Sequence, residues 1–182
     1  MAQAPGTTYS PTAKGLHWLI VLLLTVQFTT AFLLPHIGPN TPPSDIIDLH
    51  FSLGVLIMLA MAARLVVRLL HPVALDAKDA APAERLLARL THWLFYLILI
   101  VSPLMGWASA SAHRLPVSLF GLIPLPPLAA PGAHWANTAG DLHGTAMWVL
   151  LWLIGLHVAA ALYHHLLRRD GTLIRMLPAR RG

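Results

Sequence analysis

Four histidines are the residues of this sequence whose type and spacing could support chemistry. His17, His50, His143 and His157 all fall in long apolar segments, where an imidazole is costly to bury and usually marks function. His143 and His157 are fourteen residues apart, which in a helix places them on one face and about 21 Å apart along the axis. Imidazole nitrogens bind metal ions. This separation is too long for one metal centre and suits two centres stacked along a helix.

The elements that must position these histidines are predicted to be membrane-spanning helices. Of the 182 residues, 57% are hydrophobic and 10% are charged, whereas a soluble domain carries about 25% charged residues. Crossing the hydrocarbon core takes about 20 apolar residues in a helix. Four segments meet this requirement, at about residues 16–34, 46–70, 93–110 and 142–167. We therefore predict an all-α integral membrane protein, with residues 1–182 forming a single domain built as a four-helix bundle.

The stretch 116–131 is apolar but is not expected to be a fifth span. It is interrupted by several prolines, which remove backbone donors and break helices, and it is too short to cross the bilayer. We expect a loop packed on the membrane surface.

The basic residues predict the orientation of the bundle. Only Arg114, among the twelve lysines and arginines, lies in the loops 34–47 or 111–140. By the positive-inside rule both termini face the cytoplasm and these two loops face outward. The net charge of +5 then follows from topology, so membrane lipid is the expected partner and nucleic acid is not.

The four histidines form two pairs according to their predicted depth in the membrane. His50 and His143 fall near the outer surface, whereas His17 and His157 fall in the cytoplasmic half. Each pair comes from two different helices, as cofactor ligands in bundle cores do. The absence of cysteine excludes thiolate and iron–sulfur chemistry. We therefore expect two b-type haems, each held by two axial imidazoles, which would leave no open position at the iron and favour electron transfer.

Two alternatives to haem ligation are weaker. A single membrane histidine is often only a hydrogen-bonded contact between helices, but four at two matched depths favour ligation. Structural zinc needs four ligands around one point. Gly54, Gly144 and Gly155 stand close to the histidines in sequence, where glycine lets a ring approach a helix backbone, although they could equally permit only tight helix packing.

Further polar residues gather near the cytoplasmic surface. His164 is seven residues after His157 and keeps roughly its face, and we assign it a proton-exchanging role toward a quinone. We interpret His92 as an interfacial polar residue. Arg64 and Arg68 could pair with haem propionates, although a role as positive-inside anchors suffices to explain them.

At these positions the sequence resembles the bacterial cytochrome b561 family. The resemblance covers nearly the whole chain and is carried by the segments LHWL (16–19), LHFSLG (49–54), ARLVVRL (63–69), DLHG (141–144), IGLHVAAALYHH (154–165) and RDGTLIRMLP (169–178). It implies that His17 and His157 ligate the inner haem and that His50 and His143 ligate the outer haem.

The sequence is similar in particular to short members of that family that act as superoxide:ubiquinone oxidoreductases. This likeness implies a multi-pass protein of the bacterial inner membrane. Superoxide would be oxidised to dioxygen at the periplasmic face, and electrons would pass through both haems to ubiquinone. Within the outer loop, Arg114, His113 and His134 are the groups that could attract an anion.

Two other functions remain open. Similar four-helix dihaem proteins are cytochrome b subunits that link a partner dehydrogenase or hydrogenase to the quinone pool, but the short loops and termini offer no docking platform, and the sequence requires no protein partner. A small transporter ranks last, because transporters tend to show internal repeats or broken helices and neither is evident.

Overall fold

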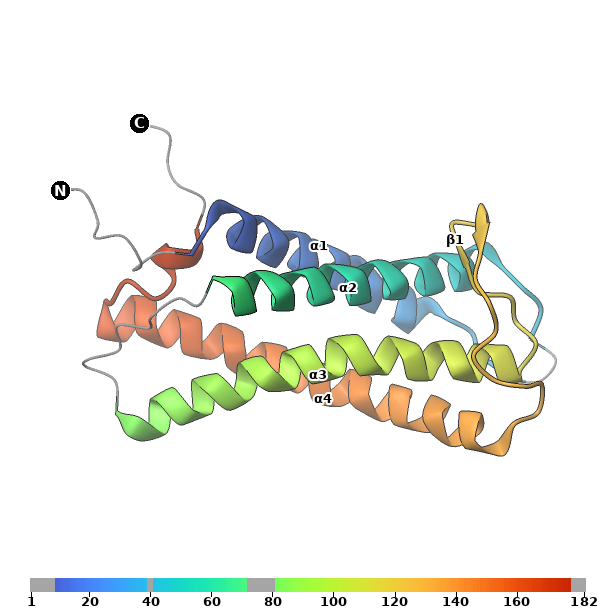
Figure 1. Ribbon diagram of the computed structural model, residues 1–182. Coiled ribbons are helices and arrows are strands. Elements are labelled where there is room, and N and C mark those ends of the chain that lie inside the picture. Colours follow the sequence, from blue (N-terminus) through green and yellow to red (C-terminus); the bar gives the residue numbers. More distant parts are fainter. Residues whose placement is uncertain (1–8, 39–40, 72–80, 178–182) are drawn as a thin grey trace.

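Four long helices make up most of the computed structural model, which describes residues 9–38, 41–71 and 81–177. They are α1 (Pro11–Leu33), α2 (Asp45–Leu70), α3 (Pro82–Ala112) and α4 (His134–Tyr163), and all four are long and apolar enough to cross a membrane (Figure 1). This confirms the predicted helical architecture with four spans. Lys78, Arg180 and Arg181, which contribute to the predicted orientation, lie outside the described residues.

Helices α3 and α4 extend furthest beyond their predicted apolar spans. Helix α3 begins at Pro82 rather than near residue 93, because proline is well tolerated in a first helical turn and the Glu84 side chain accepts the Ala81 N–H at 3.2 Å. Helix α4 begins at His134 and runs into a π-helical turn, η1 (His164–Arg168). Hydropathy marks the part of a helix that fits in lipid, so it misses polar turns that continue the helix into the interface.

The helices pack in chain order. Helix α1 lies along α2, α2 packs against α3 and α3 lies along α4, whereas among the described residues α4 is not packed closely on α1 or α2. Gly140 permits the close approach of α3 and α4, because a Cβ there would stand 2.5 Å from the Ser109 Oγ. The open sides of the bundle are therefore those between α4 and the α1–α2 pair.

One end of the bundle, which we call the hairpin end, carries a short antiparallel hairpin. Its strands are β1 (Ser118–Leu119) and β2 (Ile123–Pro124), with Ser118 opposite Pro124. Ser52 of α2 is fully buried, and its Oγ accepts the Phe120 N–H at 2.7 Å. The stretch 116–131 is thus the loop that the prolines predict.

The opposite end, which we call the terminal end, holds the start of α1 and the short helix η2 (Ile174–Met176) (Figure 1). The Trp18 Nε1–H donates to the Met176 carbonyl at 3.0 Å, and the Lys14 Nζ donates to the Leu177 carbonyl at 3.1 Å. These contacts dock residues 170–177 on α1.

The apolar core lies in the middle of the bundle. All four helices contribute to its buried cluster, which consists of Ile20, Ile57, Met61, Tyr96, Leu99 and Leu150. Leu150 is midway in sequence between His143 and His157. The core therefore separates the two levels at which the histidines lie.

Candidate functional site

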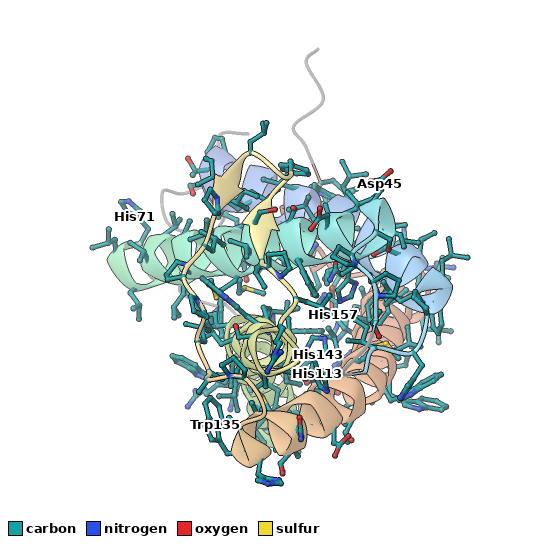
Figure 2. All side chains as sticks on the ribbon, turned by 90° about the vertical axis from the view of Figure 1, so that its right-hand side faces the viewer. Asp45, His71, His113, Trp135, His143 and His157 are labelled. Carbon is teal, nitrogen blue, oxygen red and sulfur yellow. The ribbon has the colours of Figure 1, made fainter. Side chains whose placement is uncertain are left out.

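Two pairs of imidazole rings face each other across the open sides of the bundle. At the hairpin end, His50 of α2 meets His143 of α4 with ring centroids 6.2 Å apart and planes at 89°. At the terminal end, His17 of α1 meets His157 of α4 at 6.4 Å and 65°. Figure 2 looks along the bundle from the hairpin end, with His143 and His157 between the helices and His71 on the outside. The sequence-predicted residues are thus brought together in the predicted pairs.

The spacing within each pair suits one metal ion between two rings. A bond from a metal to a histidine nitrogen is about 2 Å, and the ring centre lies ~1 Å behind that nitrogen, so two axial rings have centroids about 6 Å apart. The observed values of 6.2 Å and 6.4 Å agree with this distance at both levels. The paired rings therefore fit a bis-histidine haem.

A cavity of about 930 Å³ surrounds the hairpin-end pair and is lined by all four helices. Its volume lies within the range of about 300–1,000 Å³ that is usual for cofactor sites. Two lining residues hold buried polar atoms that have no hydrogen-bond partner among the described residues, Gln27 at Oε1 and Trp107 at Nε1. Such atoms are rare in a native protein and call for an explanation. A haem, whose propionates are hydrogen-bond acceptors, fits the free Trp107 N–H.

The His143 ring is held from two sides by α3. Its Nδ1 lies 2.8 Å from the Ser102 carbonyl oxygen and 2.9 Å from the Ser102 Oγ. A carbonyl can only accept, so Nδ1 carries the proton and the lone pair of Nε2 is free. Gly106 makes room for the ring, because a Cβ there would stand 3.1 Å from the His143 Cε1.

Helix α1 also contributes to the hairpin-end site. The Gln27 Nε2 lies 3.2 Å from the His50 Nδ1, and it donates to the His50 carbonyl at 3.2 Å. The Thr30 Oγ1 lies 3.4 Å from the same Nδ1. Sequence reasoning missed Gln27, Ser102 and Gly106. The available signals were an amide in an uncharged span and a Ser-Pro-x-x-Gly stretch inside a helix.

The terminal-end pair has different surroundings. No hydrogen bond reaches the rings of His17 and His157 within the part of the chain that the structure describes. Arg64 of α2 lies beside α1 at this level, because its Nη1 donates to the Ala13 carbonyl at 2.7 Å, one helical turn before His17. The His92 ring, interpreted from the sequence as interfacial, lies with its centroid 5.8 Å from that of His157.

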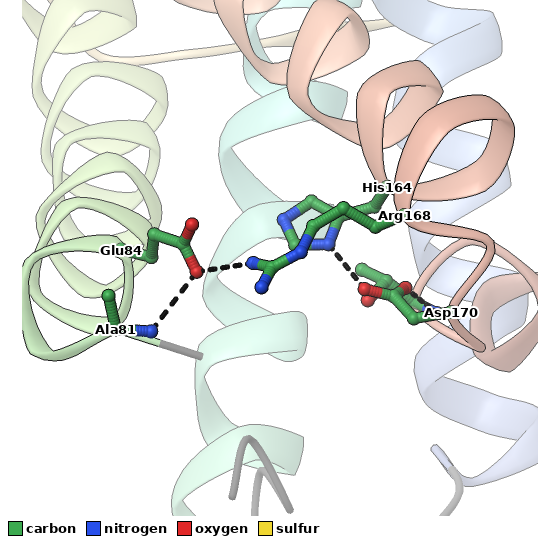
Figure 3. Close-up of polar contacts among 6 residues, drawn as sticks. Ala81, Glu84, His164, Arg168 and Asp170 are labelled. Carbon is green, nitrogen blue, oxygen red and sulfur yellow. Dashed lines mark hydrogen bonds and ion pairs between the residues drawn. The ribbon is translucent and has the colours of Figure 1, made fainter. Parts of the chain in front are cut away.

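His164, predicted to act toward a quinone, lies in η1 and is paired with Asp170 (Figure 3). Its Nδ1 is 2.5 Å from the Asp170 Oδ2. Partial burial acts to raise the pKa of Asp170, but hydrogen bonds from Thr172 and His164 outweigh it and lower the pKa to about 2. The carboxylate is therefore ionised at neutral pH and accepts the Nδ1–H. The neighbouring Arg168 bonds to Glu84 of α3 at 2.6 Å.

The glycines named in the sequence analysis differ in their surroundings. A Cβ at Gly54 would meet the Gln27 Nε2 at an ordinary 3.7 Å, whereas a Cβ at Gly144 or Gly155 would meet nothing within 4 Å. Gly144 and Gly155 therefore do not serve tight helix packing. Arg68, considered with Arg64 as a propionate partner, lies over the Tyr96 ring at 6.0 Å.

Three relatives are similar to the chain. It is 32% identical to the probable superoxide oxidase CybB of Yersinia pestis, over 96% of this chain and 98% of the relative. It is 34% identical to cytochrome b561 homolog 2 of Escherichia coli K12, over 71% and 69% of the two chains. It is also 24% identical to cytochrome b561 homolog 1 of the same strain, over 95% and 98%.

The match to a family model extends over almost the whole sequence. The model is described as prokaryotic cytochrome b561 and matches residues 8–179, a stretch that includes all four helices and both histidine pairs. With four helices able to span a membrane and the likeness to the relatives above, the chain belongs to the prokaryotic cytochrome b561 family, and this membership implies haem b, electron transport and a bacterial membrane.

Proposed function

We propose that the chain holds two haem b groups, with His50 and His143 as axial ligands at the hairpin end and His17 and His157 at the terminal end. The observation that carries the proposal is the pair of centroid separations, 6.2 Å and 6.4 Å, between rings from different helices. When bound, the haems supply one-electron transfer between the two ends. Trp107, whose buried Nε1–H has no partner among the described residues, would hold the hairpin-end haem by donating to a propionate.

The asymmetry of lysine and arginine supports a periplasmic hairpin end and a cytoplasmic terminal end in the bacterial inner membrane. The spans then carry the two haem sites at different depths. His143 and His157, about 21 Å apart along α4, set the distance between the sites.

The proposed electron donor is superoxide at the hairpin end. A relative named as a probable superoxide oxidase is 32% identical to this chain over nearly its whole length, and this likeness supports the donor. His36 and His113 line the mouth of the hairpin-end cavity, and Arg114 follows His113 on the exposed surface. These side chains would attract an anion. Each superoxide loses one electron and leaves as dioxygen.

The proposed electron acceptor is ubiquinone at the terminal end. His164 donates its Nδ1–H to Asp170, which leaves the Nε2 lone pair to take up a proton from the cytoplasmic side and then pass it to the reduced quinone. In total, two superoxide anions, one quinone and two protons give two dioxygen molecules and one quinol. The protons come from the cytoplasmic side, where His164 lies in this orientation.

The test follows quinol formation by the purified haem-loaded protein when superoxide is supplied. We expect one quinol for every two superoxide anions consumed, with turnover abolished in His50→Ala and in His17→Ala. His71→Ala is the matched control, because His71 lies outside the bundle (Figure 2) and should leave turnover unchanged. Turnover no faster than that of haem-free protein would contradict the proposed activity.

The second candidate is an electron-transfer subunit that serves a partner dehydrogenase or hydrogenase. It keeps the electron transport that family membership implies, and the names of two relatives, one of them 34% identical to this chain, contain no mention of superoxide. In the same assay this candidate predicts quinol formation from an artificial donor but none from superoxide. A redox enzyme that co-purifies in fixed stoichiometry would establish it.

A further inference from the structure

The two histidine pairs differ in what lies behind their rings. At the hairpin end, the His143 Nδ1–H is directed at two oxygens of Ser102, the carbonyl at 2.8 Å and the hydroxyl at 2.9 Å. At the terminal end, neither His17 nor His157 has a hydrogen-bonded ring nitrogen among the described residues. The two histidine pairs therefore differ in the hydrogen bonds that their ring nitrogens make.

The Ser102 contacts make His143 a stronger electron donor. An imidazole whose distal N–H donates to an oxygen is held in one tautomer and becomes more basic at the nitrogen that faces the metal. A more basic axial ligand stabilises the ferric state, because that state carries one more positive charge than the ferrous state. Ser102 therefore acts to lower the reduction potential of a haem held by His143.

The charges near the two sites also favour a lower reduction potential at the hairpin end than at the terminal end. Arg64 donates to the Ala13 carbonyl at 2.7 Å, one helical turn before His17, and a nearby cation disfavours the more positive ferric state. Within the described residues, no lysine or arginine lines the hairpin-end cavity. Arg64 therefore raises the potential at the terminal end, whereas no such cation lines the cavity at the hairpin end.

We propose that Ser102 and Arg64 give the two haem sites unequal reduction potentials, with the lower potential at the hairpin end. This inference rests on the proposed ligation of two haems. One electron moves from the hairpin-end site, which is oxidised, to the terminal-end site, which is reduced, and no proton transfer is needed. Ser102 and Arg64 are positioning residues that make this direction downhill.

A spectroscopic redox titration of the purified dihaem protein tests the inference. We expect two one-electron components whose equilibrium favours the terminal-end haem at least tenfold, which corresponds to about 59 mV. Ser102→Ala removes the hydroxyl but keeps the carbonyl contact, so it should raise only the lower potential, and only in part. Arg64→Gln should lower only the upper potential. Arg64→Lys keeps the charge and should keep the upper potential. Thr25→Ala is the control for loss of a hydroxyl, because among the described residues the Thr25 hydroxyl bonds only to the Val21 carbonyl of its own helix.

Each outcome decides between the alternatives. A single component from two haems, or a Ser102→Ala variant in which the upper potential moves, would overturn the inference and leave the dihaem proposal standing. A protein that binds fewer than two haems would instead overturn the proposed ligation itself. If either variant folds poorly, the other still assigns one component to one end of the bundle.

Discussion

At the scale of single residues, the His143 ring is fixed by contacts that leave it little freedom. Ser102 holds Nδ1 through two oxygens, while the ring lies over the backbone of Gly106 without a Cβ between them. Both contacts come from α3, which supplies no ligand of its own. The position of the His143 ring therefore depends on α3, a helix that contains none of the four predicted ligand histidines.

Substituting Gly106 tests the close approach to His143. The Cβ of Gly106→Ala would stand 3.1 Å from the His143 Cε1, and relieving such overpacking costs about 1–3 kcal/mol. We expect haem content to fall from two toward one per chain, measured as the ratio of haem to protein. Gly15→Ala, where a Cβ meets nothing within 4 Å, should retain both haems. Full haem content in Gly106→Ala would show that the ring can move away without loss of ligation.

A pH dependence follows from the Asp170 contact. The carboxyl pKa falls from 3.8 to about 2 in the fold because hydrogen bonds from Thr172 and His164 outweigh the opposing effect of burial. A lowered pKa contributes stability above the unfolded value, and this stability is lost as the pH falls from about 4 toward 2. We expect amide protection factors in residues 170–177 to decrease across that window. Asp170→Asn should show the low protection at every pH, and equal protection in the two proteins near neutral pH would contradict the contact.

The residues that could be predicted from sequence are those with rare chemistry in an apolar setting. Histidine in a membrane span is conspicuous, and the fourteen-residue interval on one helix predicts two levels. Ser102 and Gly106 are ordinary residues of membrane helices. Their role depends on how α3 is rotated about its axis relative to α4. Packing between the helices sets this rotation, and a local sequence pattern does not predict it. The neighbour of His92 could not be predicted for the same reason, because its sequence position gives its depth but not its contact with His157.

At the scale of elements, the hairpin is held to the bundle by one buried hydroxyl. The Ser52 hydroxyl hydrogen is shared between the carbonyls of Asp48 at 2.8 Å and Ser118 at 3.1 Å, and the Ser52 oxygen accepts the Phe120 N–H at 2.7 Å. Prolines in residues 116–131 predicted a loop but not this anchor. The anchor depends on a distant helix, so it could not be read from the loop itself.

Removing that hydroxyl tests the anchor. Ser52→Ala removes the partner of the Phe120 N–H, and the loss of such a hydrogen bond costs about 0.5–1.5 kcal/mol. We expect faster hydrogen exchange at Phe120 and across residues 118–124, with α1 and α4 unchanged. Thr25→Ala serves as the control here as well. Wild-type exchange in the hairpin of Ser52→Ala would mean that its apolar contacts suffice.

At the scale of the whole molecule, the bundle leaves its open sides where the histidines meet. Helix α4 packs on α3 and not closely on α1 or α2 among the described residues, and its two histidines reach across to those helices at separate depths. The number of spans could be predicted because hydropathy and length determine it. The choice of which helices stay apart could not, since four apolar helices offer many pairings of similar energy.

Haem quantitation combined with reduced-minus-oxidised spectra of the wild type and of four single His→Ala variants tests the paired ligation most directly. We expect two haems per chain in the wild type. His50→Ala and His143→Ala should lose one and the same spectral component, and His17→Ala and His157→Ala should lose the other. A colourless protein after expression with ample haem, or a pairing in which His50→Ala and His17→Ala lose the same component, would contradict the account.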